Sequence, residues 1–221
     1  MSSTPENRAV MRRRWIAAPL YGFAVVGAVG NAAHVLQPVM TLVMPFMIVG
    51  IGVLAVSLTY EVSIRSLVAL GSVLVLVFAA VASGVNLGFP FGEFAYTSRL
   101  GPKVVDVPVV IPFAWLAILI PAWAAAGRFL KYKHLIVASV LATAADAVLE
   151  FAADSLDLWH WKDGLPTELN YITWFIVSYL ALAILQTHAK ERAIHWIVPH
   201  LLSAQLLYFV LSDAGLRFLF R

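Results

Sequence analysis

About seven apolar runs fill most of this chain, and each is close to the length that a membrane-spanning helix requires. A bilayer core about 30 Å thick is crossed by about 20 helical residues, each rising about 1.5 Å. Of the 221 residues, 62% are hydrophobic and 12% are charged, whereas soluble domains are about 45–50% apolar. The sequence therefore predicts an all-α, polytopic membrane bundle of about seven helices. The predicted spans are Trp15–Leu36, Pro38–Tyr60, Leu67–Leu87, Val109–Leu130, His134–Asp154, Asn170–Thr187 and Ile194–Ser212.

Lysine and arginine predict the orientation of these helices, because cytoplasmic loops are enriched in both residues. We expect an N-in, C-out topology in the cytoplasmic membrane, with one transmembrane domain over residues 1–221 and a basic cytoplasmic segment at residues 1–14. The basic residues form no patch, so the net charge of +3 does not indicate a nucleic-acid partner. The inner side then holds most of them, namely Arg8, Arg12, Arg13, Arg14, Arg65, Arg128, Lys131, Lys133, Lys190 and Arg192.

Two carboxylates lie inside the fifth predicted span. Asp146 and Glu150 are four residues apart, so they share one helix face at a separation of about 6 Å. Ionisable groups inside a membrane helix cost about 2.5–3.5 kcal/mol on insertion scales and mark functional sites by default. The alternative for this pair is a structural network closed by His34 or an asparagine. With the predicted topology, Asp146 lies near mid-membrane and Glu150 lies nearer the outer surface.

Other polar residues gather at the outer ends of the predicted spans, beside the two long outer loops Gly88–Pro108 and Ser155–Leu169. This convergence predicts a site in the outer half of the bundle, although each residue alone is more typical of a packing hydrogen bond. The tryptophans beside helix six either form an interfacial belt or line an apolar pocket that stabilises a cation. The polar candidates include Asn31, His34, Asn86, Asn170 and Tyr171, and these tryptophans are Trp159, Trp161 and Trp174.

What the sequence lacks excludes several kinds of chemistry. There is no cysteine, so thiolate chemistry is excluded. The last predicted span has no lysine that could hold retinal, and the histidines form no clustered HxxHH pattern. No phosphate-binding or dinucleotide-binding glycine motif is present. We therefore predict no metal site and no cofactor, and we expect the chemistry to depend on carboxylates, water and aromatic rings.

One ordered set of residues carries a family resemblance. It consists of Gly88-Phe-Pro-Phe-Gly-Glu-Phe-Ala-Tyr-Thr97, Leu100-Gly101, Val107-Pro108, Pro112 through Trp115, Asp146-x-x-x-Glu150, Trp159-x-Trp161, and Asn170-Tyr171 with Trp174. In order and spacing this set resembles the membrane carotenoid-biosynthesis proteins that include the carotenoid 1,2-hydratases of the CruF type. The resemblance extends from about residue 20 to about residue 180, nearly the whole chain.

The resemblance implies a cofactor-independent hydro-lyase that adds water across the terminal C1–C2 double bond of a linear carotenoid. The partners it implies are water, the lipid bilayer and a carotenoid such as lycopene, a γ-carotene-like chain or a C50 precursor of bacterioruberin. The carboxylate pair fits this reaction, because a buried carboxylic acid beside a second carboxylate keeps its proton and can donate it to an alkene. Water then captures the tertiary cation that results.

These considerations assign a hypothetical role to each candidate residue. We expect Asp146 to be the general acid, and Glu150, Glu93 or Asp106 to position the water and accept its proton. We expect Asn31, His34 and Asn86 to order that water through hydrogen bonds. The residues expected to line the polyene channel or face the cation are Tyr96, Trp115, Trp159, Trp161 and Trp174, with Asn170 and Tyr171 as further binding residues.

Two other functions remain open from the sequence. An acid-initiated carotenoid end-group cyclase needs the same acid and the same cation but must exclude water, and its product keeps the mass of the substrate. A small proton- or cation-coupled transporter would use Asp146 and Glu150 as its ion site. Against a transporter, the inner half of the predicted bundle has no matching polar path.

Overall fold

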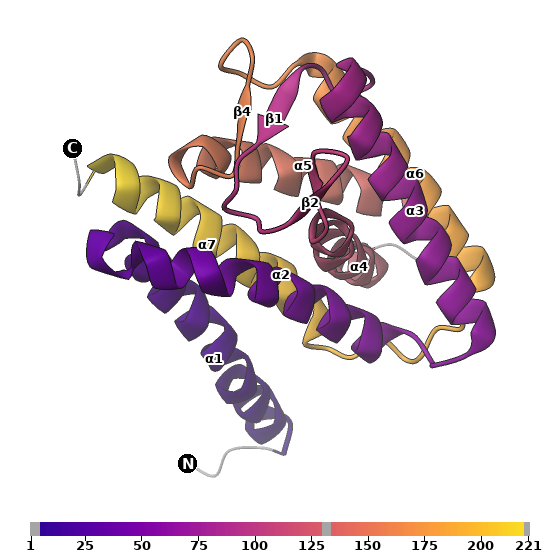
Figure 1. The fold of residues 1–221 in the computed structure, drawn as a ribbon. Coiled ribbons are helices and arrows are strands. Elements are labelled where there is room, and N and C mark those ends of the chain that lie inside the picture. The colour runs from indigo at the N-terminus through magenta and orange to yellow at the C-terminus, as the bar shows by residue number, and fades with distance from the viewer. Residues whose placement is uncertain (1–4, 130–133, 219–221) are drawn as a thin grey trace.

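Helices make up most of the chain in the computed structural model, which describes residues 5–129 and 134–218 (Figure 1). Each predicted span corresponds to one α-helix, with boundaries that differ by a few residues in the five middle helices and by up to ten residues in the first and the last. A short 3₁₀ turn, His34–Leu36, joins the first two helices. The α-helices are α1 (Pro5–Ala32), α2 (Gln37–Thr59), α3 (Ile64–Leu87), α4 (Ile111–Phe129), α5 (His134–Ser155), α6 (Glu168–His188) and α7 (Val198–Phe218).

Length and composition qualify five of these helices as membrane spans, namely α1 from Trp15, α2, α3, α5 and α6. Within α4, Ile111–Gly127 is apolar but shorter. Many large apolar side chains face outward, and Phe23, Phe46 and Val75 are 70%, 73% and 69% exposed. Such a surface is stable against lipid. A helical integral membrane protein is therefore confirmed, whereas the number of spans and their orientation stay predictions.

The first and last helices differ most from their predicted ranges, and α1 begins at Pro5, ten residues before the predicted Trp15. The sequence predicted Ile194–Ser212, but α7 begins at Val198 and continues to Phe218. The residues before it form an irregular connection, in which the Arg192 amide donates to the Thr59 carbonyl. The added C-terminal turns contain the Arg217–Asp213 ion pair, one turn apart at 2.5 Å. Apolar periodicity misses this polar end of the helix, although the ion pair supports it.

Local sequence signals explain where α3 and α6 begin and where α3 ends. The Ser63 hydroxyl caps α3 by accepting from the Ser66 amide, and the Thr167 hydroxyl caps α6 by accepting from the Asn170 amide. Gly88 ends α3 with a left-handed backbone at φ 69°, a conformation that glycine adopts without a steric penalty. The α6 cap also fixes the position of Asn170, which lies at the site described below.

The core of the molecule is built around α4, whose side chains are almost all buried. It packs against α2, α5 and α7, and more lightly against α3 and α6. Helix α5 also packs on α6, and α6 packs on α3. The four helices α3, α4, α5 and α6 therefore enclose a common interior. By contrast, α1 packs mainly against α7 and lies at the edge of the molecule (Figure 1).

The two long loops, residues 88–108 and 155–169, meet at one end of this interior and form short strands that the sequence did not predict. Strand β1 (Phe94–Tyr96) pairs antiparallel with β4 (Trp159–Trp161), so that Tyr96 lies opposite Trp159 and Phe94 opposite Trp161. A second pair consists of β2 (Lys103–Val104) and β3 (Val107–Pro108). Figure 1 shows β1 and β4 beside the end of α5. The β1–β4 ribbon thus caps the interior that α3 to α6 enclose.

Candidate active site

A cavity of about 50 Å³ lies between α3, α4, α5 and α6, beneath the β1–β4 ribbon. That volume has room for a few water molecules or for the tip of an aliphatic chain, because one water needs about 10–15 Å³ on this measure. Two carboxyl groups and one amide lie among mostly aromatic and aliphatic lining residues. The lining residues are Asp146, Glu150 and Asn170, with Val81, Phe91, Phe94, Tyr96, Ile111, Ala114, Trp115, Ile118, Leu149, Trp159, Trp161 and Trp174.

One amide bridges the two carboxylates. Asn170 Nδ2 donates to Asp146 Oδ2 at 3.2 Å and to Glu150 Oε1 at 3.4 Å. An amide nitrogen has two hydrogens, so a single side chain can serve both acceptors. Asp146 is 1% exposed and Asn170 is 2% exposed. The Thr167 hydroxyl accepts from the Asn170 backbone amide at the start of α6, and this cap fixes the position of the bridging side chain.

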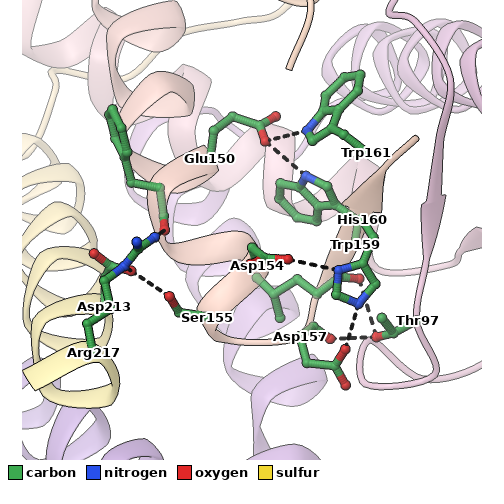
Figure 2. Close-up of polar contacts among 12 residues, drawn as sticks. Thr97, Glu150, Asp154, Ser155, Asp157, Trp159, His160, Trp161, Asp213 and Arg217 are labelled. Atoms are coloured by element: carbon green, nitrogen blue, oxygen red, sulfur yellow. Dashed lines mark hydrogen bonds and ion pairs between the residues drawn. The ribbon is translucent and has the colours of Figure 1, made fainter. Parts of the chain in front are cut away.

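Glu150 accepts two further hydrogen bonds that Asp146 does not share. The indole nitrogens of Trp159 and Trp161 donate to its Oε2 at 3.0 and 2.8 Å. Alternate side chains of a strand face the same side, so β4 presents both indoles together while His160 faces away. Figure 2 shows the two indoles converging on Glu150. Glu150 is therefore held by three N–H donors, whereas Asp146 accepts from Asn170.

Aromatic rings form most of the remaining wall. Trp115 of α4 stacks on Trp174 of α6, with ring centroids 3.7 Å apart and planes 10° apart. The edge of Phe91 meets Trp115 at 6.3 Å, and Tyr96 meets Trp159 at 5.8 Å. Burial raises the pKa of the Tyr96 phenol well above its usual range, and the carboxyl groups of Glu150 and Asp146 raise it further. Tyr96 is therefore a neutral phenol at physiological pH.

Three hydroxyl groups anchor the segment that leads from α3 to β1. Ser83 Oγ donates to the Phe89 carbonyl at 2.8 Å, Thr173 Oγ1 to the Pro90 carbonyl at 2.9 Å, and Thr167 Oγ1 to the Phe91 carbonyl at 2.7 Å. These bonds tie the segment to α3 and α6 and bring Phe91 into the cavity wall.

The next residue in this segment, Gly92, has φ +106°, and a Cβ there would lie 2.7 Å from Thr167 Cγ2. A side chain at Gly92 would therefore displace the wall.

Two predicted carboxylates lie outside the cavity. Glu93 is exposed and pairs with Lys162 at 2.7 Å. Asp106 lies in the exposed turn between β2 and β3, where its φ is 60°. Neither residue lines the cavity, so neither enters the mechanism proposed below.

Several predicted polar residues have partners elsewhere. The Asn86 amide donates to the Ala82 and Val105 carbonyls. Asn31 lies between α1 and α7, where it donates to the Tyr208 hydroxyl and accepts from Arg99 at 2.9 Å.

Tyr171 is half-buried but does not line the cavity. The side chain of His34 lies outside the described residues.

The structure brings the remaining predicted residues together and adds others that the sequence analysis missed. Asp146, Glu150, Tyr96, Trp115, Trp159, Trp161, Asn170 and Trp174 all line the cavity. Among the missed residues are Phe91 and Phe94. Their signal was the Phe-rich stretch after α3, whose alternation gives Phe94 and Tyr96 the same strand face. Among the described residues, no group of three or more His, Cys, Asp or Glu side chains is arranged to hold a metal ion.

The fold and the site together define a helical membrane protein with a carboxylate pair in an aromatic cavity. The family model for carotenoid biosynthesis proteins matches residues 42–220, which contain every residue of the cavity. The chain therefore belongs to the carotenoid biosynthesis protein family, and the resemblance at the family level is confirmed. No curated protein and no solved structure matches the chain. Membership of this family implies an enzymatic role and a carotenoid-type substrate.

Proposed function

We propose that the protein is a carotenoid hydratase, which adds water across the terminal C1–C2 double bond of a linear carotenoid. The observation that carries this proposal is the carboxylate pair, bridged by Asn170 and supplied with unequal numbers of hydrogen-bond donors. Acid-catalysed hydration needs one group that gives a proton and a second that accepts one. A pair of carboxyl groups in different environments divides these two tasks.

Asp146 is the general acid. It is buried, and its side-chain donor among the described residues, Asn170, binds Oδ2, which leaves Oδ1 for the proton. A carboxyl group in this setting is less costly to bury when it is neutral. Its proton passes to C2 of the terminal double bond, where the new C–H bond forms. The π bond breaks in the same step, and the positive charge remains on the tertiary carbon C1.

Glu150 is the general base. Hydrogen bonds to the charged form of a carboxylate favour that form, and Glu150 accepts three of them. The oxygen of a water molecule in the cavity bonds to C1, and Glu150 takes the proton that this water loses. Return of that proton to Asp146 through cavity water restores both groups. The product then differs from the substrate by one added water.

The aromatic wall stabilises the intermediate. A cation is attracted to the face of an aromatic ring by about 0.5–2 kcal/mol, with the larger value in a dry site. Trp115 and Trp174 line the cavity together with the carboxylates and are 3% and 7% exposed. Because the two rings stack on each other, each can offer a cation only the face that the other leaves uncovered. The cavity also accommodates water beside the polar cluster, which supports hydration over the water-excluding cyclisation of the same cation.

Product mass tests the proposal. The protein would be produced in a lycopene-making host, and carotenoids would be separated by chromatography with mass detection under anaerobic growth. Wild type should yield a product heavier by one water. The yield of that product should be at least about 100-fold lower with the Asp146→Asn variant, because the general acid has been removed. Asp163→Asn, an exposed outer-loop change, is the matched control and should keep full yield.

Three results would contradict the proposal. Full activity of a folded Asp146→Asn protein would remove the acid assignment. A new product of unchanged mass would indicate cyclisation instead. Unchanged pigments with folded wild type on lycopene, a γ-carotene-like chain and a C50 precursor would reject hydration, and proton flux in liposomes would then support a transporter.

A further inference from the structure

His160 binds two carboxylates on the outer face of the β1–β4 ribbon. Its Nδ1 lies 3.0 Å from Asp154 Oδ1, and its Nε2 lies 2.9 Å from Asp157 Oδ1 (Figure 2). Asp154 belongs to the last turn of α5, and Asp157 to the turn between α5 and β4. The residue paired with His160 on β1 is Ala95, so β1 brings no charged group to the ring. The ring thus connects β4 to the end of α5.

Only the protonated ring can make both contacts as hydrogen bonds. A neutral imidazole has one N–H donor, whereas imidazolium donates from both nitrogens. An ionised carboxylate has no proton to donate in return. The hydrogen bond with Asp154 raises the pKa of His160, and the bond with Asp157 raises it further. The doubly bound state is therefore the charged state of His160.

The position of His160 in the sequence links this clamp to the cavity. Its chain neighbours on β4 are Trp159 and Trp161, whose indoles hold Glu150. Strand β4 has three residues and one partner strand among the described residues, so β1 alone provides its backbone pairing. Asp154 lies four residues after Glu150, on the same face of α5. One helix therefore provides the acceptor for the indoles and an anchor for the strand that carries them.

We propose that His160 is a positioning residue: in its protonated form it fixes β4 against the end of α5 and thereby holds the Trp159 and Trp161 indoles on Glu150. The effect of this clamp on catalysis rests on the proposed function of Glu150, whereas the effect on the indoles does not. Loss of the clamp loosens two of the three N–H donors from which Glu150 accepts hydrogen bonds.

The clamp should depend on pH in a defined direction. Because the pKa of His160 is raised in the folded protein, its stabilising effect is complete below the unfolded value of about 6.5 and is lost as pH rises through the folded value. Both carboxylates and the ring are largely exposed, and exposed ion pairs are weak. We therefore expect product formation to fall by about two- to fivefold across this transition.

The indole N–H groups report on the clamp without any substrate. The chain has seven tryptophans, so isotope-labelled tryptophan in detergent micelles gives a short nuclear magnetic resonance spectrum. Trp159→Phe and Trp161→Phe assign the two relevant signals. In wild type both should shift between about pH 5.5 and pH 9, with a midpoint above about 6.5. In His160→Gln both should be independent of pH.

Two further variants keep the test decisive. Lys162→Gln breaks the exposed pair with Glu93 in the same ribbon and should leave the titration unchanged. Asp154→Asn keeps the histidine but removes its largest stabilising contact, so the midpoint should fall towards about 6.5. The variant also serves if His160→Gln does not fold.

Indole signals that ignore pH in wild type, or that titrate identically in His160→Gln, would overturn the positioning role. The two proposals can fail separately. Titration of the indoles without any hydrated product would retain the clamp and reject the hydratase. A hydrated product whose pH profile is the same in wild type and in His160→Gln would retain the hydratase and reject the effect of the clamp on catalysis.

Discussion

In the part of the chain that the structure describes, two glutamates accept hydrogen bonds from indoles, at two different places in the bundle. Glu150 binds Trp159 and Trp161 inside the aromatic cavity. Glu191 binds Trp123 at 3.0 Å in the connection between α6 and α7. The edge of His134 meets the Trp123 ring at 5.5 Å, and the Glu191 backbone pairs with that of Tyr60. The same contact therefore occurs in two very different settings.

The difference between them lies in what surrounds the contact. Burial raises the pKa of Glu191, while the Trp123 indole and the His134 ring oppose that shift. Glu150 lines the cavity and shares the Asn170 amide with Asp146. Among the described residues, Glu191 has no such bridging amide, and it does not line the cavity. An indole bound to a carboxylate thus identifies a well-held side chain. A second carboxylate and an adjoining cavity are what point to chemistry.

Paired substitutions at the two glutamates should separate the settings most strongly. Glu150→Gln keeps an acceptor for the indoles but removes the base, so hydrated product should fall about 100-fold or more. Glu191→Gln keeps an acceptor for Trp123 and should leave product within about twofold of wild type. Carotenoid yield per amount of folded protein measures both. Equal losses in the two variants would show that the contrast has no functional meaning.

Removal of the bridging amide should have an intermediate effect. Asn170→Ala leaves Asp146 and Glu150 without their shared donor and opens space between them. Loss of a hydrogen bond to charged groups costs about 1.5–3 kcal/mol, which corresponds to a fall in product of about 10-fold or more. Asn86→Ala is the control, because its amide serves two carbonyls outside the cavity. A larger effect at Asn86 would place the functional amide elsewhere.

Single indole changes should have the smallest effect of the three. Trp161→Phe removes one of two N–H donors to Glu150 Oε2 while Trp159 remains, so product should fall about three- to tenfold. Trp123→Phe removes the corresponding donor to Glu191 and should lower thermal stability with little change in product. Yield and melting temperature, measured together, distinguish the two results. Activity lost equally in both variants would mean that the indoles contribute through packing alone.

Much of the fold could be predicted from the sequence, because membrane spans depend on a one-dimensional property. Runs of apolar residues near 20 in length located each helix. The end of α7 was missed because Asp213 and Arg217 interrupt the apolar pattern, yet neutralise each other one turn apart. The β1–β4 ribbon was missed because its pairing joins residues far apart in the chain, and three-residue strands leave almost no periodic signal.

The part of the candidate site that lies on α5 could be predicted from helical spacing. The part that the loops contribute could not. The four-residue spacing placed Asp146 and Glu150 on one face of α5. Glu93 and Asp106 were grouped with them only because they lie on the same side of the predicted membrane. In the structure Glu93 faces outward to Lys162. Proximity to a membrane surface therefore does not give the direction of a loop side chain, and strand register supplies that information.

The most direct test of the central claim is the source of the new oxygen atom. Purified protein in lipid vesicles would be given a linear carotenoid in water labelled with heavy oxygen, in the absence of molecular oxygen. Hydration with Asp146 as the general acid should give a tertiary alcohol that carries the label from wild type, and almost none from Asp146→Asn. An unlabelled product, a product of unchanged mass, or equal labelling by the variant would contradict it.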